Sequence, residues 1–375
     1  MATLPPASDW PVLQRAVENA FAPPAPARSK SSRIIDSIIP ASWNLFRKKR
    51  FPNAIYVLTY HSVVDPGHRE MWEQCYRKGE TTVVQLHRQL EFMMRHMTPV
   101  ALSSVPQLWA EGGLDRPCFV VTFDDGMTNN RTHAHAIVRS LGITPTVFVC
   151  SEFARQRQTF FRVLAAVLVQ QGYASRLAAN LRASFPQWVW PDDGEALFNA
   201  TKGHYCGGAM VDVIDATYRA CLGDPRGLAV HLDRDGVAYL AKNGWEIGNH
   251  TRSHHLLAWQ TREEVVQAIQ GNADDWREEG IPLIDFIAYP IGRARDVGPD
   301  VWQAMQRFPH LHGLFCNGGV NFSLNRCEWM RFSFGRHTDP DVLEKIINQE
   351  VQRTRIARAT LPSSQEGPFQ NPAAP

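Results

Sequence analysis

The sequence predicts an α/β fold in which a parallel sheet or barrel is interrupted by a mostly helical insertion. The first observation behind this prediction is that short apolar runs alternate with helical patterns about seven times, an order typical of parallel strands covered by helices. The second is that about ninety residues of helical material separate two consecutive strands, a stretch too long for a loop. The composition of the 375-residue chain, 44% hydrophobic and 20% charged, is that of a globular protein.

Each element is predicted from its own pattern of apolar residues. Short apolar runs predict strands within residues 54–60, 98–102, 118–124, 144–150, 244–250, 286–291, 312–316 and 329–334. Apolar residues at helical spacing predict helices within residues 83–97, 132–142, 232–244, 261–280 and 298–308. We therefore expect residues 51–154 and 232–345 to form one strand-and-helix domain, with residues 155–231 as the helical insertion.

The two ends of the chain are predicted to lie outside this domain. Residues 1–50, a peripheral N-terminal segment, contain a Pro-, Ala- and Ser-rich linker followed by isoleucines and a basic cluster. The second part could be a helix that contacts an anionic membrane surface, or a packed helix with a solvated basic end. Pro40 in its middle favours the packed helix. The composition of residues 361–375 predicts a disordered tail.

The net charge, the length of the apolar runs and the cysteine spacing exclude several classes of protein. The formal net charge is +2, whereas a nucleic-acid-binding protein would usually show a strong basic excess. No apolar run reaches the ~18 residues of a transmembrane helix, and the N-terminus lacks the basic-then-apolar order of a signal peptide. The seven cysteines are scattered without a CxxC pair, which predicts reduced thiols and a cytoplasmic location instead of a disulfide framework.

Chemically active side chains follow two of the predicted strands. Asp124 and Asp125 come directly after a buried apolar strand, and Gly126 allows the backbone to turn sharply beside them. His250 and His254 follow another strand, and a spacing of four on a helical turn would put both imidazoles on one face. Active sites of parallel α/β folds gather at the carboxyl ends of strands. Two imidazoles and one carboxylate there make a three-point site for Zn²⁺ or a similar divalent ion.

The two adjacent carboxylates can divide the work at such a site. One can ligate the metal, and the other can take a proton from the attacking water. Taken singly, Asp-Asp-Gly is more often a plain turn, and a His-x3-His pair is more often an exposed helical face. Both at the ends of apolar strands in one chain favour a metal site. His61 also lies at the end of a strand, the first one.

Three motifs of the sequence carry a resemblance to a known family. The stretches "TFDDG", "HTRSH" and "YPIG" occur in the same order as the motifs of the polysaccharide deacetylase (NodB-homology) family, carbohydrate esterase family four, which the chain resembles. The likeness covers about residues 53–155 and 232–340. The first two motifs are specific in combination, and the third alone is weak. The resemblance implies a distorted (β/α) barrel of about seven parallel strands, which agrees with the strand count.

The resemblance also implies roles for individual residues. It makes Asp124 the general base and Asp125, His250 and His254 the metal ligands. In the branch similar to poly-N-acetylglucosamine deacetylases, the acid histidine follows an N-terminal strand, and His61 in "YHS" matches that arrangement. The alternative for His61 is a satisfied core histidine.

One position departs from the family pattern. The family often has an arginine four residues before the proline of the third motif, where it braces the base, but here that position is Phe286. Arg293, Arg295 and Arg331 could each substitute, and the sequence does not decide between them.

The function that the resemblance implies is a metal-dependent deacetylase acting on the N-acetyl group of an amino sugar or glycoconjugate intermediate. Its cofactor would be Zn²⁺, with Co²⁺, Ni²⁺ or Fe²⁺ as alternatives. The same site could hydrolyse another C–N bond, as a deformylase or cyclic amidase does. A non-catalytic sugar-binding scaffold is a third interpretation, although it would not need a base beside the metal. Trp188 and Trp190 of the insertion could stack on sugar rings or pack in a core.

Overall fold

The structure is a computed structural model that describes residues 51–111, 114–205, 207–293, 296–316 and 318–360, with side chains described to residue 356. The predictions for residues 1–50 and 361–375 lie outside these ranges. The chain divides into two compact units, residues 1–52 and 53–375. The strands, the helices and the candidate site described below all belong to the second unit.

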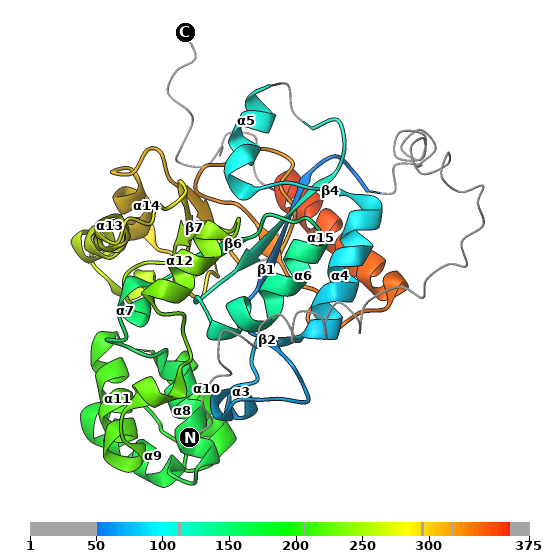
Figure 1. Ribbon diagram of the computed structural model, residues 1–375. Helices are drawn as coiled ribbons and strands as arrows, with labels where there is room; N and C mark the ends of the chain where they lie inside the picture. Colours follow the sequence, from blue (N-terminus) through cyan, green and yellow to red (C-terminus); the bar gives the residue numbers. More distant parts are fainter. Residues whose placement is uncertain (1–50, 112–113, 206, 294–295, 317, 361–375) are drawn as a thin grey trace. The chain divides into compact units, whose positions relative to one another are not determined.

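A parallel sheet curls into a nearly closed barrel of seven strands (Figure 1). The strands follow the order β10-β1-β5-β6-β7-β8-β9, and β4 pairs with β5 beside this path. A parallel bridge between Leu314 and Trp329 links the two ends of the order. The predicted parallel barrel is therefore confirmed. The strand bounds are β1 (Ile55–Tyr60), β4 (Thr98–Pro99), β5 (Cys118–Phe123), β6 (Thr146–Val149), β7 (Glu246–Asn249), β8 (Phe286–Ala288), β9 (His312–Leu314) and β10 (Arg331–Phe332).

Strands β1 and β5 are buried along their whole length. Strands covered on both faces lack a polar side, which is why both are continuous apolar runs in the sequence. Their register pairs Ile55 with Cys118 and Tyr60 with Phe123, so the two strands end side by side. The backbone N–H of Asp124 continues the ladder by donating to the carbonyl of Tyr60 at 2.9 Å. The residues that follow β1 and β5 therefore share one edge of the barrel.

The helices that alternate with the strands have clear start signals. Helix α4 (Val83–His96) begins with a capping box of Thr82 and Gln85, and α13 (Arg262–Glu278) begins with one of Thr261 and Glu264. No helix among the described residues is long and apolar enough to cross a membrane. The other helices along the barrel are α5 (Val105–Ala110), α6 (His135–Ser140), α12 (Arg234–Lys242), α14 (Pro299–Met305) and α15 (Pro340–Thr360).

The chain between β6 and β7 is helical. A hydrophobic cluster holds its helices together and includes Met127 and Leu256, which follow β5 and β7. The cluster thus joins the inserted helices to the carboxyl edge of the barrel. Trp190 is buried in it, and the ring of Trp188 stacks on that of His204, so both tryptophans have packing roles. The helices are α7 (Ser151–Ala154), α8 (Phe161–Gln170), α9 (Ala174–Ser184), α10 (Gly194–Gly203) and α11 (Gly208–Leu222).

A smaller structure lies between β1 and α4. Strand β2 (Val63–Val64) pairs in parallel with β3 (Thr81–Thr82), and the short helix α3 (Met71–Cys75) lies in the connection between them. The connection begins two residues after His61. At its end, β3 pairs with β2, so the chain lies close to His61 again.

Candidate functional site

Asp125, His250 and His254 form a compact, buried set at the carboxyl edge of the barrel. Each offers one ligand atom, and these atoms lie within 4.8 Å of one another. The Asp125 Oδ1 atom is 3.2 Å from Nε2 of His250 and 3.1 Å from Nε2 of His254. The structure thus brings together the three residues that the sequence nominated as metal ligands, from the ends of β5 and β7.

The hydrogen bonds of His250 fit a bound cation. The Nδ1 atom of His250 lies 2.8 Å from the carbonyl oxygen of Ala288, which can only accept, so Nδ1 carries the proton. In the neutral ring, the Nε2 lone pair then faces the Asp125 carboxylate, an arrangement that a divalent ion between them would stabilise. Without a metal, protonated His254 and His250 would take the place of the cation: burial tends to raise the pKa of Asp125, but the charge and hydrogen bonds of these two rings lower it well below its usual value. Asp125 is therefore ionised and can serve as a ligand.

The backbone around this set differs from the prediction. The helical turn expected for His250–His254 is wrong, because these residues form a loop in which Thr251 and His254 have φ of 63° and 56°. The Thr251 N–H donates to the side chain of Asn249 at 2.9 Å, so it makes no helical hydrogen bond. Asp125 also has a positive φ of 69°. Left-handed residues other than glycine cost about 1 kcal/mol or more each, and they persist where the surrounding structure holds them.

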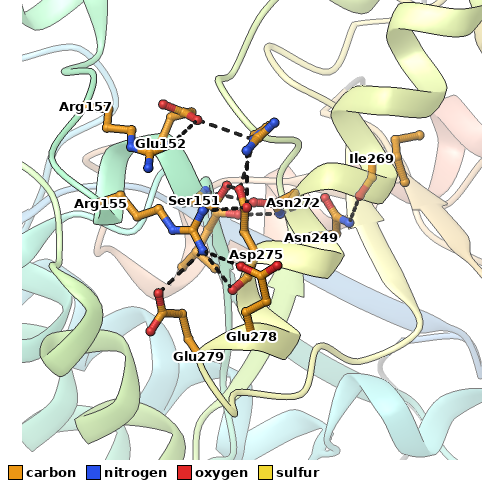
Figure 2. Close-up of polar contacts among 12 residues, drawn as sticks. Ser151, Glu152, Arg155, Arg157, Asn249, Ile269, Asn272, Asp275, Glu278 and Glu279 are labelled. Carbon is orange, nitrogen blue, oxygen red and sulfur yellow. Dashed lines mark hydrogen bonds and ion pairs between the residues drawn. The ribbon is translucent and has the colours of Figure 1, made fainter.

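A buried carboxylate on α13 holds the loop that carries His250 and His254 (Figure 2). Asp275 accepts hydrogen bonds from the Ser151 hydroxyl at 2.5 Å, from Arg155 at 2.6 Å and from Nε of Arg252 at 2.9 Å. Arg252 lies between His250 and His254, whereas Ser151 and Arg155 lie where the chain leaves β6 for the insertion. Asp275 thus fixes the loop and the insertion to one helix.

One turn earlier on α13, Asn272 ties the ends of β6 and β7 together. Its Nδ2 donates to the Val149 carbonyl at 3.0 Å and to Oδ1 of Asn249 at 2.9 Å, and its Oδ1 accepts from the Ser151 N–H at 2.8 Å. Asn249 in turn donates to the carbonyl of Ile269 at 3.0 Å (Figure 2). The loop that carries His250 and His254 is therefore anchored at its start by side chains.

Asp124, the neighbour of Asp125, has a different partner. Arg331 of β10 binds both of its carboxylate oxygens, Nη1 to Oδ1 at 2.7 Å and Nη2 to Oδ2 at 2.8 Å. Arg331 is fully buried, and it also donates to the Phe315 carbonyl at 3.1 Å and the Thr122 hydroxyl at 3.1 Å. Burial tends to raise the pKa of Asp124, but Arg331 more than offsets this and lowers it. Asp124 is therefore ionised near neutral pH.

The structure thus decides which arginine lies beside the predicted base. Arg331 takes the bracing position, whereas Arg293 pairs with Asp296 at 2.8 Å. The third candidate, Arg295, lies outside the described residues.

His61 lies on the solvent side of Asp124. Its Nε2 is 4.0 Å from the Asp124 Oδ2 atom, and its side chain is 36% exposed. A ring with this exposure does not fit the alternative of a satisfied core histidine. Its position suits a group that exchanges protons with both the solvent and a molecule above Asp124, and the acid role stays a prediction.

Sequence reasoning missed the residues that support the site, among them His231. The Phe160 N–H donates to its Nε2 at 3.2 Å, so Nδ1 carries the proton and donates to the Asp125 carbonyl at 2.9 Å. Burial lowers the pKa of His231 to about 4, which keeps the ring neutral. His231 therefore holds the left-handed backbone of Asp125 from the far end of the insertion. No motif surrounds it, so the sequence offered no signal.

These features define the class of protein: a parallel (β/α) barrel with a candidate Asp-His-His metal centre and a separate, arginine-bound aspartate at its carboxyl edge. The polysaccharide deacetylase family matches residues 111–310, just over half of the chain, and the chain belongs to this family. The family expected from the motifs is thereby confirmed. No curated protein matches the sequence.

The solved structures that resemble this one are only distantly related in sequence. The Streptococcus pyogenes deacetylase PplD in complex with acetate is 15% identical, with a TM-score of 0.51 over 79% of this chain and 99% of that one. IcaB from Ammonifex degensii is 13% identical, with a TM-score of 0.48 over 79% and 97% of the two chains. A de-N-acetylase from Aggregatibacter actinomycetemcomitans is 13% identical, with a TM-score of 0.49 over 78% and 100%. At 15% identity, the likeness to PplD shows a shared fold and nothing beyond it.

Proposed function

We propose that the protein is a metal-dependent deacetylase that hydrolyses the N-acetyl group of an amino sugar or glycoconjugate intermediate. The observation that carries this proposal is that two adjacent carboxylates have different partners. Asp125 faces two histidines, whereas Asp124 is bound through both oxygens by buried Arg331. The arginine keeps Asp124 ionised and occupies one position on each of its two oxygens. A binding scaffold would gain nothing from a second buried carboxylate held in this way.

The geometry supports a division of roles in amide hydrolysis. A divalent ion held by Asp125, His250 and His254 would polarise the acetyl carbonyl and acidify the attacking water. Asp124 accepts the proton of that water, because each of its oxygens keeps an acceptor position beside its bond to Arg331. The water oxygen bonds to the acetyl carbon, the C–N bond breaks, and acetate leaves. His61 delivers a proton to the departing nitrogen, since an amine leaves far more easily than an amide anion.

The acetyl group and the amino sugar come from the family and from the neighbour that is described as a deacetylase in complex with acetate. The ligand set suits Zn²⁺, and Co²⁺, Ni²⁺ and Fe²⁺ accept the same donors. The cytoplasmic location and the membrane contact of residues 1–50 remain predictions, which fractionation of cells containing the full-length protein tests.

The test is a panel of amino sugars that differ only in the acyl group. Purified protein loaded with Zn²⁺, Co²⁺, Ni²⁺ or Fe²⁺ is incubated with N-acetyl and N-formyl sugars, and released acetate or formate is measured. We expect acetate release that disappears in the Asp124→Asn variant. The matched control is Asp296→Asn, which alters another buried aspartate bound by an arginine, Arg293. Formate release without acetate release would assign the site to a deformylase.

A further inference from the structure

A second charged cluster lies next to the candidate active site. Glu80 is buried, and its carboxylate binds Arg69 at 2.8 Å, Arg77 at 3.1 Å and Arg336 at 3.2 Å. Burial tends to raise the pKa of Glu80, but Arg69 and Arg77 lower it, so the group carries a negative charge. Three guanidinium groups on one carboxylate leave two positive charges uncompensated within the cluster.

Only one of the three arginines is needed to neutralise Glu80. The side chain of Arg69 is 15% exposed and already pairs with Glu80 at the shortest of the three distances. The side chains of Arg77 and Arg336 are 57% and 62% exposed, and each also pairs with Glu80. More than half of each of these two side chains is open to solvent, and Lys78, which follows Arg77, is exposed as well. Both guanidinium groups lie within 3.2 Å of the same carboxylate oxygen, so an anion that binds beside Glu80 would be attracted by both of them.

The segment that carries Arg77 and Glu80 lies against His61. A Cβ atom added to Gly79 would be 3.6 Å from Nδ1 of the His61 ring. The Thr81 N–H donates to the carbonyl of Ser62, the residue after His61, at 2.9 Å. The segment that carries Arg77 and Glu80 is therefore held beside His61, the predicted acid.

The turn that carries Arg336 is fixed at the same place by a buried glutamine. Gln89 donates to the carbonyls of Gly335 at 3.0 Å and His337 at 2.8 Å, and its Oε1 accepts from the Tyr60 hydroxyl at 3.0 Å. Tyr60 is the last residue of β1 and directly precedes His61. The segment with Arg77 and Glu80 and the turn with Arg336 are thus both held at the carboxyl end of β1, at the edge that carries Asp124.

We propose that Arg77 and Arg336 bind a phosphate group on the substrate, which makes the substrate an N-acetylated amino sugar with a phosphate ester. This inference rests on the proposed deacetylase function and specifies its substrate class. Guanidinium groups bind phosphate oxygens through paired N–H donors. A phosphate monoester dianion would neutralise both of the excess charges, whereas a carboxylate would neutralise one.

The test compares a phosphorylated and a neutral substrate in the metal-loaded protein. N-acetylglucosamine 1-phosphate and methyl N-acetylglucosaminide differ in charge but share the acetamido group. We expect the wild type to show the higher kcat/KM for the phosphate, and Arg77→Gln combined with Arg336→Gln to lower the ratio of the two kcat/KM values at least about 10-fold. Arg95→Gln is the matched control, since Arg95 is 62% exposed and pairs with Glu91 on α4; its ratio should equal that of the wild type.

Further substrates distinguish the sources of the phosphate. A nucleoside diphosphate sugar and a polyprenyl diphosphate sugar in detergent carry the same acetamido group, and the better of the two identifies the natural carrier. If the ratio of the two kcat/KM values is unchanged in the double variant, the inference is overturned. The arginines would then only stabilise the segment around Glu80. Preference for an N-acetylated sugar bearing a carboxylate over the phosphate would also overturn it.

A binding measurement separates this inference from the proposed function. If no acetamido sugar is hydrolysed, the proposed function fails, and calorimetry with N-acetylglucosamine 1-phosphate then decides the inference. Weaker binding in the double variant than in the wild type and Arg95→Gln supports a phosphate site. Equal binding in all three proteins, or none, refutes it.

Discussion

The ion pair between Asp124 and Arg331 permits a quantitative prediction. Both side chains are buried, at 2% and 0% exposure, so removing one partner leaves a charge without compensation. Such a loss costs about 3–5 kcal/mol, and we expect this destabilisation for Arg331→Met and again for Asp124→Leu. The double variant has no stranded charge. Its remaining cost is the loss of the Arg331 hydrogen bonds to Phe315 and Thr122, about 1 kcal/mol each.

The assay is a double-mutant cycle on metal-loaded protein, with the free energy of unfolding measured in urea. We expect the double variant to be several kcal/mol more stable than the sum of the two single losses, because the single variants share one cause. The cycle on Arg293 and Asp296 is the control. Arg293 is 34% exposed, so its charge is partly solvated and its coupling should be about 1 kcal/mol or less. Additive losses at Asp124 and Arg331 would refute the reasoning, since they would mean that water reaches the pair.

Other predictions concern the metal and the acid. His250→Ala should lose both metal and activity, and metal analysis that found full occupancy would contradict the ligand assignment. Asp124→Asn should keep the metal while turnover falls at least about 100-fold; a metal-free variant would make Asp124 a ligand. His61→Ala should keep fold and metal but lose about 100-fold on amides and less on an ester, whose leaving group needs less protonation. An equal loss on both would mean that His61 only shapes the site. Asp275→Asn should weaken metal binding by about 10-fold or more, because the loop loses its anchor, whereas Asp274→Asn on the same helix should not; equal affinities would show that Asp275 is dispensable.

Local patterns were enough to predict the elements and the three residues that the structure brings together in the candidate metal centre. The strands and helices depend on apolar spacing within each segment, which is why β5 and α13 lie within a few residues of their predicted bounds. Asp125, His250 and His254 lie in two short stretches that each follow a buried strand. Parallel strands end at one edge, so placing them together required only the fold class.

The conformation of the loop that carries His250 and His254 was not predictable from spacing. The four-residue interval between His250 and His254 suggested a helical turn, but the loop has a different backbone with two left-handed residues. That backbone depends on Asn249, Asn272 and Asp275, which belong to β7 and α13. A pattern of residue types along one segment carries no information about side chains that reach it from another helix.

The choice of Arg331 was decided by the tertiary structure alone. It lies 207 residues from Asp124, and the sequence offered Arg293 and Arg295 as equal candidates. The parallel pairing of β10 with β1 places Arg331 opposite Val57 and lets its side chain reach the end of β5. His231 and the basic cluster around Glu80 arise in the same way. The sequence determined which residues can perform the chemistry, because that depends on their types and their strand ends. Strand register and closure of the barrel decided their partners, because contacts across hundreds of residues form only when the chain has folded.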